Sequence, residues 1–224
     1  LKVFRQLQPG ENPDVEVGRR LAGHSQDARV PALVAFAMYE PAGAPPVSVA
    51  MLQQQVPSRG SAWELALDSV EAYCERALIE QRQRTERGDT SPPTPEEIRE
   101  LIGAYCATAE LLGRRTADLH HTLAGLEGEG FGARPLDTAG LAAMAQDISG
   151  QVERALELLR NAEGSLSEQT RHAAARLVEL KPAIVARLER LRELPDGGMR
   201  TRIHGDFHLG HVLEADGDVY FIDF

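Results

Sequence analysis

Cysteines and long apolar runs are scarce in this sequence, and each shortage excludes a class of protein. Two cysteines in 224 residues cannot form the disulfide network of a small secreted domain. Cys74 and Cys106 lie on expected helices without metal-like spacing, so we expect free, buried thiols in a reducing cytoplasm. No stretch has the length and apolarity of a secretory signal or a membrane-spanning helix.

Positive charge is also in short supply. The chain has 24 lysines and arginines against 34 aspartates and glutamates, for a formal net charge of −10. Nucleic acids and anionic membranes bind clustered positive charge, so neither is an expected partner. Hydrophobic residues make up 42% of the chain, which is enough for a core in one or two subdomains. The expected class is a soluble enzyme that acts on a small molecule.

Residues that can carry chemistry gather at the C-terminal end, in residues 204–224. Asp206 follows a glycine in an expected turn, and Asp223 closes the β-branched and aromatic run 219–222, which predicts a buried strand. An Asp-Gly pair at residues 216–217 lies between two apolar runs, a strong signal for a β-hairpin. Such a hairpin would bring Asp206, His211 and Asp223 together.

Phosphoryl transfer fits this set of residues. It needs a group that orients the nucleophile, ligands for magnesium and a cation on the phosphates. Asp206 can accept the proton of a hydroxyl group, while His211 and Asp223 are placed as metal ligands. Each fragment alone would be an ordinary turn or strand end, and only their order and spacing together indicate this chemistry.

A zinc hydrolase is a specific alternative to an enzyme of phosphoryl transfer. His204, His208 and His211 are close in sequence, and imidazole is a common zinc ligand. Their spacings of four and three residues could place all three on one face of a helix. Gly205 and Gly210 interrupt the stretch, however, and glycine disfavours a helix interior by roughly 1 kcal/mol relative to alanine.

The string Arg202–Gly210 resembles the catalytic loop of bacterial maltokinases, which belong to the aminoglycoside-phosphotransferase-like group of the protein-kinase-like superfamily. The similarity extends in family order to Leu1–Arg5, Asn12–Arg19, Ala50–Gln53 and Leu112–His120. Maltokinases of this kind also occur fused to trehalose synthase, which makes that enzyme an expected fusion partner or associate.

The resemblance implies a role for each matching residue. Asp206 would be the catalytic aspartate that faces the sugar hydroxyl, and Asp223 would bind Mg²⁺. Lys2 would hold the phosphates of ATP, and Glu16 would pair with Lys2. His208 would contact the sugar or support the loop.

His211 departs from the family pattern. The second metal ligand is usually Asn in the wider group and Gln in maltokinases. Because Mg²⁺ prefers oxygen ligands, a histidine here would weaken one metal site, act through a bridging water or favour Mn²⁺.

The rest of the pattern predicts an α+β fold. A strand over Leu1–Leu7 precedes a helix over about residues 13–22, with Asn12 as its cap and proline at its first position. Two apolar runs, Val30–Tyr39 and Val47–Val56, are separated by a proline-rich stretch and predict an antiparallel pair.

Long helices are expected to follow. Their ranges are about 61–87, 95–124, 137–163 and 167–194, the last broken or kinked near Pro182. On the first helix, apolar residues recur at helical spacing and are expected to pack in the core: Trp63, Leu67, Val70, Cys74, Ala77 and Leu78.

With the resemblance, this order implies a protein-kinase-like two-lobed fold that is truncated at both ends. Residues 1–57 would form a partial β-rich N-lobe, and residues 58–224 a mainly helical C-lobe with the catalytic β-hairpin. Gln54 and Val56 would lie where the chain passes between the lobes and meet the adenine of ATP.

The expected function is ATP-dependent phosphorylation of a sugar hydroxyl, with maltose as the first choice and maltose 1-phosphate as its product, in the direction from trehalose to glycogen. One alternative is a related kinase for an aminoglycoside or a choline-like substrate. The other is a non-catalytic kinase-like module, which His211 favours. The chain is expected to be a fragment of a longer protein, and inactive without the phosphate-covering loop of its relatives.

Overall fold

A computed structural model describes residues 1–24, 26–128 and 130–224. Its contacts divide the chain into two units, one of residues 1–132 with 202–224 and one of residues 133–201. The fold is α+β, as predicted. The predicted lobe boundary after residue 57 stays a prediction.

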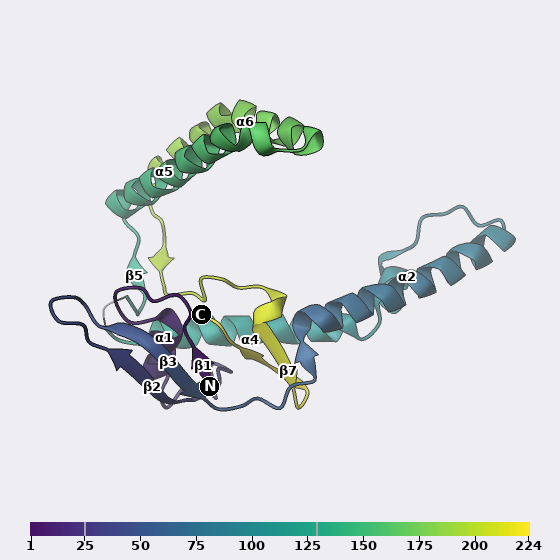
Figure 1. The fold of residues 1–224 in the computed structure, drawn as a ribbon. Helices are drawn as coiled ribbons and strands as arrows, with labels where there is room; N and C mark the ends of the chain where they lie inside the picture. Colours follow the sequence, from purple (N-terminus) through teal and green to yellow (C-terminus); the bar gives the residue numbers. More distant parts are fainter. Residues whose placement is uncertain (25, 129) are drawn as a thin grey trace. The chain divides into compact units, whose positions relative to one another are not determined.

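The first unit begins with a three-stranded antiparallel sheet in the order β1–β3–β2 (Figure 1). Its strands are β1 (Lys2–Val3), β2 (Leu33–Tyr39) and β3 (Val47–Gln53). The predicted pairing of the two apolar runs is confirmed, since β2 and β3 pair along their whole length. Helix α1 (Pro13–Arg20) begins where predicted, and the Asn12 side chain accepts a hydrogen bond from the Asp14 amide at 3.0 Å.

The predicted hairpin forms the larger part of a second sheet, in the order β4–β7–β8. Strands β7 (Val212–Ala215) and β8 (Asp218–Phe221) pair so that only residues 216 and 217 form the loop, and β4 (Gly60–Ser61) pairs with β7. Asp216 and Gly217 have φ angles of 54° and 74°. Positive φ at both positions is what a type I′ turn requires, so the Asp-Gly signal is confirmed.

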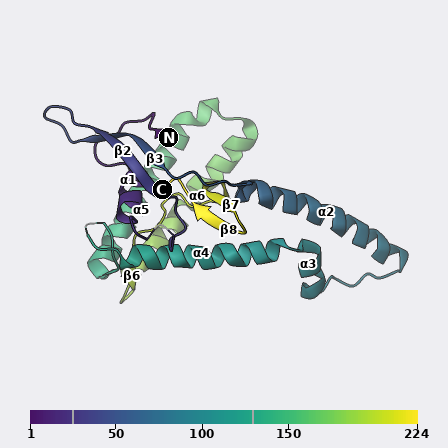
Figure 2. The ribbon, with the colours of Figure 1, turned by 90° about the horizontal axis from the view of Figure 1, so that it is seen from below.

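Helix α2 (Ala62–Glu86) is confirmed, and the single helix predicted over residues 95–124 is wrong. The chain forms α3 (Pro95–Ile102) and α4 (Tyr105–Gly125) instead, and α3 lies between the end of α2 and the start of α4 (Figure 2). Gly103 separates them with φ 70° and ψ −138°, a conformation that essentially only glycine adopts. Arg76 of α2 donates hydrogen bonds to the last carbonyls of α3, at 2.8 Å to Leu101 and 3.3 Å to Ile102.

The core of the first unit gathers apolar side chains from α1, α4, the hairpin and the segments around them. Its larger members are Val17, Leu21, Val30, Leu119, Leu123, Phe131, Val212, Val219 and Phe221. Helix α2 contributes Ala62 alone to this cluster. The predicted burial of its apolar stripe is wrong, since Trp63, Leu67, Val70 and Leu78 are each more than half exposed.

Both cysteines are free, as predicted, and their predicted burial is wrong because both are exposed. A period of 3.6 residues shows that a helix has an apolar face, but does not show that another element covers that face.

Among the helices of the described ranges, none combines the length and apolarity needed to cross a bilayer.

The second unit is a helical hairpin closed by a short two-stranded sheet. Strands β5 (Arg134–Pro135) and β6 (Met199–Arg200) pair, and the chain between them forms α5 (Thr138–Ala162), the 3₁₀ turn η1 (Glu163–Ser165) and α6 (Glu168–Arg192). Both predicted helices are confirmed. Of the predicted break or kink near Pro182, the break is wrong, since α6 continues through that residue, and the kink stays a prediction.

Candidate functional site

Asp223 lies two residues after the end of β8, and hydrogen bonds of Ile222 connect this segment to the loop that carries Asp206. The Ile222 amide donates to the carbonyl of His211 at 3.0 Å, and the Ile222 carbonyl lies 2.9 Å from Nε2 of His204. Asp223 has a φ of 63°, in the left-handed region that non-glycine residues seldom adopt. Backbone strain of this kind persists where the surrounding structure fixes it, as it does here.

His204 is buried and links the segment after β8 to the loop of Asp206. Its Nε2 donates to the Ile222 carbonyl, and its Nδ1 accepts the Asp206 amide at 3.4 Å, so both ring nitrogens are engaged. Burial lowers the pKa of His204 and the nearby His211 lowers it further, which together outweigh the opposing hydrogen bond to Ile222. The ring is therefore neutral at pH 7. Among the described residues, the histidine and carboxylate side chains close enough to share a metal ion are Asp206, His208 and His211, so His204 of the predicted zinc set is not among them.

Lys2 joins the two ends of the chain, which meet at this site (Figure 1). Its Nζ donates to Oδ1 of Asp223 at 2.8 Å and to Oδ2 of Asp14. Asp14 is buried, and its Oδ1 accepts the Phe224 amide at 2.6 Å. Burial lowers the pKa of Lys2, but the hydrogen bonds to the two carboxylates outweigh it and raise the pKa above its usual value. A charged ammonium group is thus fixed beside Asp223.

The predicted pairing of Lys2 with Glu16 is wrong. Glu16 accepts a hydrogen bond from Nη2 of Arg202 at 3.1 Å, while Asp14 holds Lys2. Residues two apart on an α-helix point to opposite sides, because successive residues turn by about 100°. Only one of the two carboxylates can therefore face Lys2, and sequence reasoning missed that Asp14 is the one.

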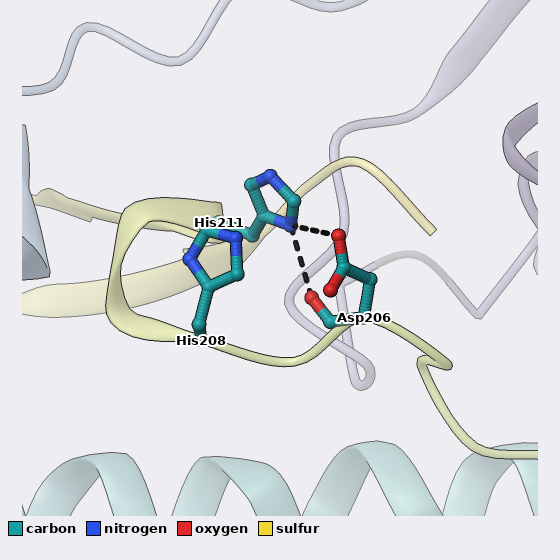
Figure 3. Close-up of side chains that lie close together, drawn as sticks. All are labelled: Asp206, His208 and His211. Atoms are coloured by element: carbon teal, nitrogen blue, oxygen red, sulfur yellow. Dashed lines mark hydrogen bonds and ion pairs between the residues drawn. The ribbon is translucent and has the colours of Figure 1, made fainter. Parts of the chain in front are cut away.

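Asp206, His211 and Asp223 come together as predicted. Nδ1 of His211 lies 3.0 Å from the Asp206 carbonyl and 3.8 Å from its Oδ2 (Figure 3), and Nε2 of His211 lies 3.9 Å from Oδ2 of Asp223. The Asp206 side chain is 76% exposed, so its carboxylate is open to a ligand. The rings of His208 and His211 lie with their centroids 3.8 Å apart and are tilted by 36° relative to each other. The individual roles of these residues stay predictions.

Gln54 and Val56 lie in the segment that leaves β3. The Gln54 amide donates to the Ala32 carbonyl at 2.8 Å, and the Val56 carbonyl accepts the Ser58 amide at 2.8 Å. These main-chain groups thus already have hydrogen-bond partners, one in the segment that leads into β2 and one in the segment that leaves β3. Their contact with adenine stays a prediction.

The donor atoms fit Mg²⁺ in part. Mg²⁺ is commonly held by one or two carboxylates together with substrate phosphates, and Asp223 offers such a carboxylate. His211 offers only nitrogen, which suits zinc, copper, iron or nickel better. The ammonium group of Lys2 supplies the cation that phosphates require. Asp223 and Lys2 therefore fit a metal–nucleotide ligand, and His211 fits it less well.

Comparisons with known proteins bear on the family and the fold of the chain. The model of the phosphotransferase enzyme family matches residues 14–224. A glucosamine kinase of Streptacidiphilus jiangxiensis is 27% identical over 182 residues, which cover 81% of this chain and 33% of that protein. A crystal structure of a glucosamine kinase has a TM-score of 0.58 and 21% identity, over 99% of this chain and 44% of that one.

The structural likeness confirms the predicted kinase-like fold, and the family match confirms the predicted superfamily. The chain spans about a third of the curated relative and less than half of the solved one.

Proposed function

The chain belongs to the phosphotransferase enzyme family, and from this premise we propose that the full-length protein transfers the terminal phosphoryl group of ATP to a sugar hydroxyl. The observation that carries the proposal is the junction of Lys2 with Asp223, next to a loop that presents an exposed Asp206. A fixed cation, a carboxylate for a metal and an open carboxylate are the parts that phosphoryl transfer needs.

Each residue of this set has a distinct role in the proposal. Asp206 accepts a hydrogen bond from the sugar hydroxyl and orients its oxygen toward the terminal phosphorus of ATP. It takes up the hydroxyl proton as the bond from the sugar oxygen to phosphorus forms and the bond from phosphorus to the leaving ADP breaks. Lys2 holds the phosphates through its positive charge. Asp223 would hold Mg²⁺, which supplies neutralisation of the negative phosphate oxygens when bound. His204 keeps the two loops in register through its bonds to Ile222 and Asp206.

Two sugars are candidates for the acceptor. Maltose follows from the resemblance of Arg202–Gly210 to maltokinases, with the anomeric hydroxyl as the site of phosphorylation and maltose 1-phosphate as the product. This version includes fusion to, or association with, trehalose synthase. Glucosamine follows from the name of the curated relative at 27% identity.

A panel of sugars tests the proposal. The full-length protein is incubated with ATP and Mg²⁺, and with maltose, glucosamine, glucose or trehalose in turn, while ADP release is followed. A maltokinase would release ADP with maltose and consume the reducing end in step, because the anomeric carbon carries the new phosphate. A glucosamine kinase would respond to glucosamine and leave maltose untouched. ADP release that no sugar stimulates would contradict the proposal.

A further inference from the structure

Three side chains of the catalytic loop could hold a metal ion of a kind that the kinase reaction does not need. Asp206, His208 and His211 each offer one donor atom, and the three atoms lie within 4.8 Å of one another. Among the described residues, this is the group of histidine, cysteine and carboxylate side chains that meets this spacing. Figure 3 shows His211 next to both other residues, in line with its contacts to Asp206 and His208.

We propose that these three residues form a site for a transition-metal ion, with Zn²⁺ as its best occupant. Two imidazoles and one carboxylate are the ligand set of zinc sites that keep an open fourth position. The same set is poor for Mg²⁺, which demands oxygen ligands. His208 and His211 thus select against the metal of the kinase reaction and for zinc-like ions.

The distances allow binding after a small adjustment. Ligands around a tetrahedral zinc ion at about 2.1 Å lie about 3.4 Å apart, so the donor atoms have to close by at most about 1.4 Å. The Asp206 side chain is 76% exposed and can rotate toward the two rings. Because all three residues lie on one short loop, this closure needs no movement of the core.

Local structure already gathers the two rings. The ring of His208 lies over Gly210, where an added Cβ would be 2.9 Å from its Cε1, so a larger residue at position 210 would push the ring away. Nδ1 of His208 accepts the Gly210 amide at 3.0 Å, and Nδ1 of His211 bonds to the Asp206 carbonyl. Metal binding would replace one or both of these hydrogen bonds with a bond to the metal ion. The loop is open to solvent, so water can bind the backbone groups that lose their partner.

Occupation of this site has a functional consequence. An ion bound to the Asp206 carboxylate takes the group that would accept the sugar hydroxyl, so zinc is expected to oppose phosphoryl transfer. This consequence rests on the proposed kinase function. The binding itself does not, and it is therefore tested without ATP or sugar.

The test measures competition for Zn²⁺ between the full-length protein and a chromophoric chelator, with excess Mg²⁺ present so that oxygen-only sites are filled. Wild type is compared with His208→Asn and His211→Gln. Asparagine at position 208 can still accept the Gly210 amide, and both replacements are poor zinc ligands. His172→Ala, which removes an exposed histidine of the second unit, is the matched control.

The expected result is loss of one zinc site, or an affinity at least about 10-fold weaker, in both loop variants and not in the control. Co²⁺ gives a second readout, since the visible absorption of the wild-type complex should fade in the same two variants. Circular dichroism checks that each variant is folded. Equal zinc affinity and stoichiometry in folded wild type and folded loop variants would overturn the site, whatever sugar the protein phosphorylates.

Discussion

Replacing Asp14 with asparagine tests which carboxylate of α1 holds Lys2. The Asp14→Asn side chain keeps an oxygen for the Phe224 amide but loses the charge that faces the ammonium group. Glu16→Gln is the matched control, because it removes the same charge from the same helix and instead affects the bond to Arg202. Each variant is combined with Lys2→Met in a double-mutant cycle, which isolates the pairwise energy.

The expected size follows from burial. A hydrogen bond to a charged group contributes about 1.5–3 kcal/mol when it is well shielded. Asp14 is 7% exposed, but Lys2 is 38% exposed, so solvent screens the pair in part. We therefore expect a coupling energy of about 1–2 kcal/mol between Lys2 and Asp14. For Lys2 and Glu16 the coupling should be within about 0.5 kcal/mol of zero.

Urea unfolding of the full-length protein, followed by circular dichroism, gives the free energies of the cycle. The coupling of Lys2 with Asp14 should also shrink as salt is added, because part of it is exposed to solvent. The reasoning is refuted if Lys2 couples to Glu16 as strongly as to Asp14.

Three further predictions concern stability. The folded protein protonates His204 at a lower pH than the unfolded chain, whose histidine has its usual pKa of 6.5, so the free energy of unfolding should fall below pH 6.5 in wild type and less so in His204→Gln. Gly103→Ala should cost about 1–3 kcal/mol in urea unfolding because of its backbone conformation, whereas Gly113→Ala, in open space within α4, should stabilise by about 0.5–1 kcal/mol. Asp218→Asn weakens the paired bonds from Arg115, which are 2.8 Å long each, and should lower the free energy of unfolding by about 1.5–3 kcal/mol. A lower midpoint of thermal unfolding would show this loss.

Local signals predicted much of the fold because local backbone chemistry decides those features. The Asp-Gly pair at residues 216–217 sets a two-residue turn, and this turn fixes the register that places Asp223 two residues after the end of β8. Cap residues work in the same way: Asn12 and Pro13 begin α1 at the residue that the sequence predicted.

Features that depend on distant partners could not be predicted in this way. The stripe that includes Trp63 and Leu67 has helical periodicity, yet coverage depends on elements far along the chain. The break at Gly103 is stabilised by Arg76 of another helix, which caps α3. A glycine within an apolar helical pattern was the available signal for this break, and it carries weight only when such a partner is known.

The candidate site also has residues whose positions follow from local signals and residues whose partners lie far along the chain. Asp206, His211 and Asp223 could be predicted because the hairpin determines where they lie. The partner of Lys2 could not, because Lys2 and Asp14 come from different elements and the resemblance indicated Glu16. The opposed directions of residues two apart on a helix would have shown that only one of them can face Lys2.

The most direct test of the central claim is the sugar-dependent release of ADP by the full-length protein with Asp206→Asn, compared with wild type and Asp216→Asn. The control substitution makes the same charge change in the tip of the hairpin, where asparagine tolerates the left-handed backbone. We expect kcat/KM to fall at least about 100-fold for Asp206→Asn, the usual effect of losing a general base. Asp216→Asn should stay within about threefold of wild type, as surface changes do. Near-normal turnover by Asp206→Asn on the sugar that wild type phosphorylates would contradict the account.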